Sequence, residues 1–123
     1  MRQILFIGLG GFIGTIARYL LSKLINNAVT VSFPYGTLVV NILGSVLIGA
    51  LYGYFESKNL ISNELKLFFT VGICGGFTTF SAFAHENFLF LRDGNIYHFA
   101  IYTSVSVILG IAAILLGYWM IKL

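Results

Sequence analysis

The sequence predicts an all-α membrane protein with four transmembrane helices. Hydrophobic residues make up 59% of its 123 positions and charged residues only 9%, a composition typical of bilayer proteins. The charged side chains leave four long uncharged runs, and a hydrocarbon core of about 30 Å needs roughly 20 helical residues to cross it. These runs predict one transmembrane domain over residues 1–123, with helices near 4–25, 34–55, 65–91 and 96–121.

The short connectors between these helices exclude several classes of protein. No soluble domain can be built from them, so any function must reside within the membrane-embedded helices. No nucleophile, base and orienting group can be assembled from the few polar residues, which argues against an enzyme. The net charge of +3 comes from single basic residues at helix ends, where they anchor in membrane lipid, so we expect no nucleic-acid partner.

The first helix carries one small-residue pair and one arginine. Gly10 and Gly14 are four residues apart, a spacing that suits close helix packing. Arg18 lies towards the far end of this helix. Its side chain either anchors at the headgroups or attracts anions to a vestibule.

The second helix carries a polar and small-residue stripe that starts at Asn41. The stripe continues at four-residue intervals through Ser45, Gly49 and Gly53. We expect the uncharged Asn41 amide to face another helix or a cavity and not lipid. Two roles remain open for it, an interhelical hydrogen bond and contact with a transported species.

The third helix contains a glycine- and hydroxyl-rich stretch that predicts a break near its middle. The residues concerned are Gly72, Gly75, Gly76, Thr78, Thr79 and Ser81. Each glycine disfavours a helix by about 1 kcal/mol relative to alanine. A break would expose carbonyl groups on one side and N–H groups on the other, whereas the alternative is a tightly packed, unbroken helix. Just beyond this stretch, Phe80 and Phe83 share a helix face, either for packing or with their positive ring edges towards an anion.

Hydroxyls in the fourth helix and one carboxylate in the third extend the set of polar candidates. Tyr102 and Ser106 are four residues apart, and their hydroxyls either replace water around an anion or bond within the protein. Glu86 lies near the end of the third span. It is either a proton-coupling group or a member of a polar network.

Basic residues are almost evenly divided between the two ends of the four-helix arrangement. One end has Arg2, Lys58, Lys66 and Lys122, and the other has Arg18, Lys23 and Arg92. Orientation normally follows an excess of Lys and Arg on the cytoplasmic side, so a near tie predicts insertion in both directions. An antiparallel, dual-topology homodimer with a two-fold axis in the membrane plane then becomes possible. A single fixed orientation with a weak signal is the alternative.

Two motifs resemble those of the Fluc (CrcB) fluoride channels. They are G-T-L-V-V-N, ending at Asn41, and G-G-F-T-T-F-S-A-F, which runs from Gly75 to Phe83. The resemblance covers the whole chain and includes its length, its four spans and Arg18. It implies an inverted homodimer in the cell inner membrane, with two pores through which cytoplasmic fluoride leaves passively.

The resemblance also implies roles for individual residues. A structural Na⁺ at the dimer interface would be held by the backbone carbonyls of Gly75 and Thr78. The fluoride pores would be lined by Asn41, Thr79, Phe80, Ser81, Phe83, Tyr102 and Ser106. One departure is Gly110, one turn beyond Ser106, where some members have a hydroxyl, which leaves the length of the polar track open.

Two other functions compete with a channel. A small dual-topology, proton-coupled multidrug exporter also has four spans, but it would need a carboxylate at mid-bilayer in the first helix, which has none. A scaffold or holin-like protein would use its glycines for packing alone.

Overall fold

The computed structural model describes all residues, Met1–Leu123, and every regular element in it is helical. The first two spans are α1 (Arg2–Ala28) and α2 (Tyr35–Ser57), and the last is α6 (Ile96–Lys122). The third span, Asn63–Arg92, is divided into shorter elements. All four spans are long and apolar enough to cross a membrane, so the prediction of a multi-pass, all-α membrane protein is confirmed.

The third span changes helix type twice along its length. Ser62 starts it by accepting a hydrogen bond from the Leu65 amide at 3.3 Å. At Thr78 and Thr79 the backbone is extended, with φ/ψ of −91°/158° and −149°/118°. The elements before and after these two threonines are α3 (Asn63–Leu67), a π-helix η1 (Phe68–Cys74), α4 (Gly75–Phe77) and α5 (Phe80–Arg92).

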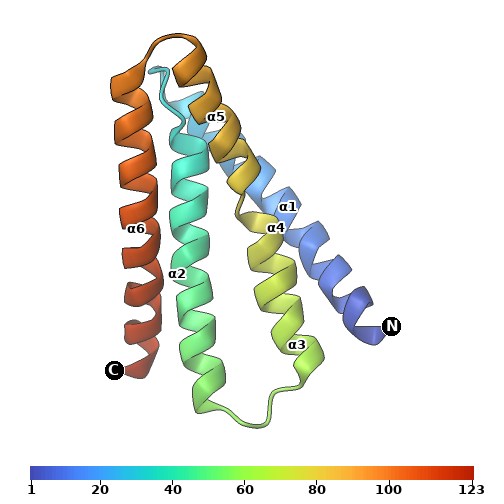
Figure 1. The fold of residues 1–123 in the computed structure, drawn as a ribbon. Coiled ribbons are helices and arrows are strands. Elements are labelled where there is room, and N and C mark those ends of the chain that lie inside the picture. Colours follow the sequence, from blue (N-terminus) through green and yellow to red (C-terminus); the bar gives the residue numbers. More distant parts are fainter.

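The spans pack as two helix pairs, which meet at the end of the bundle that contains the α1–α2 and α5–α6 loops (Figure 1). In one pair α2 lies alongside α6, and in the other α1 crosses the first half of the third span, η1 and α4. Glycines allow the close approach within each pair. A Cβ at Gly117 would meet the carbonyl oxygen of Val46, and one at Gly14 would meet the carbonyl oxygen of Ile73.

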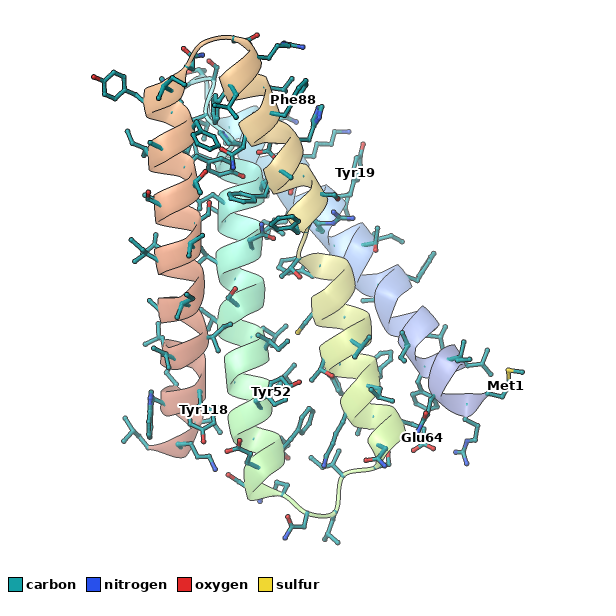
Figure 2. All side chains as sticks on the ribbon, in the orientation of Figure 1. Met1, Tyr19, Tyr52, Glu64, Phe88 and Tyr118 are labelled. Carbon is teal, nitrogen blue, oxygen red and sulfur yellow. The ribbon has the colours of Figure 1, made fainter.

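Much of the apolar surface remains uncovered, because only 14 of the 123 residues are buried. Side chains project from all sides of the helices in Figure 2. In a bilayer these surfaces face lipid or a second protein, since the backbone is already paired within the helices. Both termini and the α2–α3 loop lie at one end of the bundle, and the α1–α2 and α5–α6 loops lie at the other (Figure 1).

α1 is longer than its predicted range of 4–25, since it begins at Arg2 and includes Asn26 near its end. Long or polar side chains at the ends of a span reach the headgroup region without breaking the helical ladder.

Candidate functional site

Asn41 and the extended backbone at Thr79 form the centre of the candidate site. The Thr79 amide donates to Asn41 Oδ1 at 2.8 Å, and Asn41 Nδ2 donates to the Thr79 carbonyl at 3.0 Å. A side-chain amide thus pairs with both backbone groups of one residue in the way a neighbouring β-strand would. This pair explains how the extended Thr79 keeps hydrogen-bond partners among membrane helices, where an unpaired peptide group costs several kcal/mol, roughly 2–7.

The extended backbone at Thr78 and Thr79 leaves several backbone carbonyls without helical partners, among them those of Gly75 and Thr78. Because the Thr79 amide bonds to Asn41, it does not reach the carbonyl of Gly75 four residues earlier. The Ala82 amide likewise donates to Thr79 Oγ1 at 3.1 Å, as in an N-cap, and not to the carbonyl of Thr78. These two carbonyls are the ones that the family resemblance implies as Na⁺ ligands, which stays a prediction.

A hollow of about 440 Å³ lies beside this backbone, between α2, α6 and the third span. Gly75 and Thr78 line it, and Gly75 has open space where a Cβ would be. The polar and aromatic candidates that also line it are Asn41, Thr79, Phe80, Phe83 and Ser106. Gly110 is a further lining residue, one turn beyond Ser106 on α6.

The two phenylalanines differ in exposure. Phe80 is 78% exposed at the edge of the hollow, whereas Phe83 is partly buried. Its ring lies 5.8 Å from that of Phe83, and the Phe83 ring lies 5.2 Å from that of Tyr102. A row of rings therefore leads from the open face of the molecule to its interior.

Tyr102 lies behind this row and does not line the hollow. It is fully buried, and its hydroxyl donates to Glu86 Oε2 at 3.2 Å. Glu86 Oε1 accepts a second hydrogen bond, from Thr37 Oγ1, at 2.6 Å. Thr37 and Glu86 line another hollow, of about 500 Å³, at the end of the bundle with the α1–α2 loop.

Thr37 was not predicted as a site residue, although its sequence position carried a usable signal. It lies one helical turn before Asn41 on α2 and so extends the polar stripe by one step. A carboxylate in an apolar helix needs donors, and Thr37 supplies one of them to Glu86.

The remaining candidates occupy three different settings. The Ser106 hydroxyl is buried without a hydrogen-bond partner, so its proton is free at the wall of the hollow. Ser81 is exposed, with its hydroxyl 3.3 Å from that of Thr79. Arg18 lies on α1, outside the walls of the hollows described here and without a carboxylate partner.

Comparisons with known proteins identify the family of the chain. Residues 5–118 match the family described as CrcB-like protein, Camphor Resistance (CrcB). A protein of Flavobacterium psychrophilum named "Fluoride-specific ion channel FluC" is 47% identical over 113 residues, which cover 92% of this chain and 91% of the relative. Proteins with the same name are 46% identical in Phocaeicola vulgatus, over 98% of both chains, and 43% identical in Campylobacter jejuni, over 99% of both. With a match over nearly all of its length, the chain belongs to the CrcB family.

Proposed function

We propose that this protein is a fluoride-selective channel that lets cytoplasmic fluoride leave passively across the cell inner membrane. One observation carries the proposal: side chains suited to a small anion gather in one hollow. Asn41, Phe83 and Ser106 reach it from three different spans. The names of the relatives identify fluoride as the anion to test.

The chemistry of the hollow suits an ion that must exchange its water in steps. Fluoride is small and strongly hydrated, and moving it bare into an apolar interior is prohibitive. Ser106 has a free hydroxyl proton, and Asn41 has a second amide proton beyond the one given to Thr79. The positive ring edges of Phe80 and Phe83 add weak attraction without a formal charge that would hold the ion.

The open face of the hollow supports an inverted homodimer with two pores. Phe80 is mostly exposed, and there is open space where a Cβ of Gly75 would lie, so this wall of the hollow is incomplete in one chain. A second copy related by a two-fold axis in the membrane plane would complete it and place its own Phe80 at the same interface. The near tie of basic residues between the two ends is consistent with insertion in both orientations.

In this proposal the third span works as two half-helices around a structural Na⁺. The carbonyls of Gly75 and Thr78, which lack their helical partners, are hard oxygen donors of the kind Na⁺ prefers. Two copies would supply four such oxygens close to the two-fold axis. The ion would neutralise carbonyl dipoles at the dimer centre, and Thr79, Ser81 and Tyr102 would stabilise the walls of the pores on either side.

A proton-coupled exporter fits the polar groups less well. Glu86 is the one carboxylate inside the helical interior, and both of its oxygens already accept hydrogen bonds. α1 contains no Asp or Glu at all. A free carboxylate facing a substrate cavity, as an exporter needs, is therefore missing.

The test is anion efflux from liposomes that contain the purified dimer. Vesicles loaded with fluoride or chloride are diluted into anion-free buffer, a potassium ionophore collapses the membrane potential, and a selective electrode records each anion. We expect rapid fluoride efflux, no chloride efflux and no dependence on a pH gradient. Efflux that requires a pH gradient would favour the exporter, and silence for both anions would refute the channel.

A further inference from the structure

A third hollow, of about 560 Å³, opens near the end of the bundle that contains the termini. It lies between the start of α1, the end of α2 and the start of the third span. Its walls are formed by Gln3, Tyr52, Phe55, Glu56, Asn63, Lys66, Leu67 and Thr70. Thr70 also lines the hollow with Asn41 and Phe83, so this residue lies between the two hollows.

The charges in this outer hollow do not cancel. Its one carboxylate, Glu56, accepts a 2.6 Å hydrogen bond from the Tyr118 hydroxyl and lies 3.3 Å from the Lys122 ammonium. Its one cation, Lys66, has no carboxylate within 4.0 Å. The negative charge is thus compensated by α6, while the positive charge is uncompensated and half-buried in the wall.

Lys66 is also the strongest hydrogen-bond donor at this entrance. The Thr70 hydroxyl, which also lines the outer hollow, donates its proton to the Lys66 carbonyl at 2.8 Å. The Lys66 ammonium carries three protons and is bound by no acceptor of the protein. Along the third span, residues at four-residue intervals run from the outer hollow to the inner one: Lys66, Thr70, Cys74 and Thr78.

We propose that the outer hollow is an anion-collecting entrance and that Lys66 concentrates fluoride there before the ion reaches the Asn41 hollow. This inference rests on the proposed channel function and adds a specific residue to it. An uncompensated charge in a cleft raises the local concentration of the opposite ion and its entry rate. Lys66 acts through its charge, and it takes no part in selecting fluoride over chloride.

An electrostatic role has a salt dependence that a structural role lacks. The screening length is about 30 Å at an ionic strength of 0.01 M and about 3 Å at 1 M. In low salt the Lys66 charge is felt across the whole entrance, and in high salt it is screened within one ion diameter. Removing it should therefore slow fluoride entry in low salt only, by roughly threefold for a single charge.

The experiment compares Lys66→Gln, Lys66→Arg and Lys58→Gln in the liposome assay. Lys58 is the matched control, because it is exposed at the same end of the bundle but does not line the hollow. Initial fluoride efflux is measured with the impermeant salt sodium gluconate at about 0.01 M and about 1 M. Size-exclusion chromatography confirms that each variant is still a dimer.

We expect Lys66→Gln to reduce efflux about threefold in low salt and to match the wild type in high salt. Lys66→Arg and Lys58→Gln should conduct like the wild type in both. Equal efflux of Lys66→Gln and wild type in low salt would overturn the inference, as would a loss that persists in high salt or accompanies loss of the dimer. If the wild type conducts fluoride and Lys66→Gln conducts equally well in low salt, only this inference fails. If the wild type shows no fluoride efflux, the proposed channel function fails as well.

Discussion

Replacing Asn41 with alanine should straighten the third span. The substitution removes both hydrogen bonds that hold the Thr79 peptide unit, at 2.8 and 3.0 Å. The freed Thr79 amide can then return to the Gly75 carbonyl four residues earlier, as in a continuous helix. The same rearrangement takes away one of the two carbonyls assigned to Na⁺.

The magnitude follows from the two hydrogen bonds. Each contributes about 1 kcal/mol net, and each buried group left without a partner costs about 1–3 kcal/mol. If the amide and carbonyl of Thr79 both lost their partners, the free energy of unfolding would fall by roughly 2–6 kcal/mol, and by roughly 1–3 kcal/mol if the amide finds the Gly75 carbonyl.

Ser45→Ala is the matched control for this substitution. Ser45 lines the same hollow one turn away, but its hydroxyl donates at 2.8 Å to the carbonyl of Asn41 in its own helix. Its removal leaves the Thr79 peptide unit untouched. We expect it to change the free energy of unfolding by less than about 1 kcal/mol.

Two measurements on the reconstituted dimers test the reasoning. Unfolding in mixed micelles of increasing dodecyl sulfate content gives the change in free energy. The backbone carbon shifts of Thr79 in solid-state NMR distinguish extended from helical geometry. Thr79 shifts that stay extended in Asn41→Ala, together with unchanged stability, would show that Asn41 does not hold this segment.

Three further predictions concern the rings, the ion and the helix contact. Phe80→Leu and Phe83→Leu should each lower fluoride efflux about tenfold without dissociating the dimer, because that factor corresponds to a loss of about 1.4 kcal/mol of ring-edge attraction. Normal efflux in both variants would exclude a role for the rings. Replacing Na⁺ with N-methylglucamine should lower the thermal midpoint of the purified dimer, and adding Na⁺ back should restore it in a concentration-dependent way; a midpoint indifferent to Na⁺ would exclude the structural ion. Gly117→Ala should destabilise the fold by about 1–3 kcal/mol in the micelle titration, because its new methyl group would meet the carbonyl of Val46. Gly8→Ala should not, because there is open space where its Cβ would lie. Equal stabilities of the two variants would contradict the tight α2–α6 contact.

Hydropathy and charge spacing were sufficient to predict the helical architecture. A bilayer admits only helices or closed barrels, so long apolar runs leave little choice of local structure. The glycines and hydroxyls between Gly72 and Ser81 predict a break in the third span, and the structure has extended backbone at Thr78 and Thr79. Both inferences use information that lies within one segment of the chain.

Partners between helices could not be predicted in the same way. The sequence indicated that Asn41 would face a cavity or another helix, but not that it would bond to the Thr79 backbone. It left Glu86 open as a proton-coupling group or a member of a polar network, but it did not name the hydroxyls of Thr37 and Tyr102 as the donors to this carboxylate.

The physical reason lies in how the helices meet. Helical periodicity decides which residues share a face, but the rotation and height of one helix against the next depend on where glycines let the backbones touch. In this chain Gly14 and Gly117 mark such contacts. The sequence alone therefore determined the four apolar spans. The tertiary structure decided which side chain meets which backbone group, because only helix packing sets the register between spans.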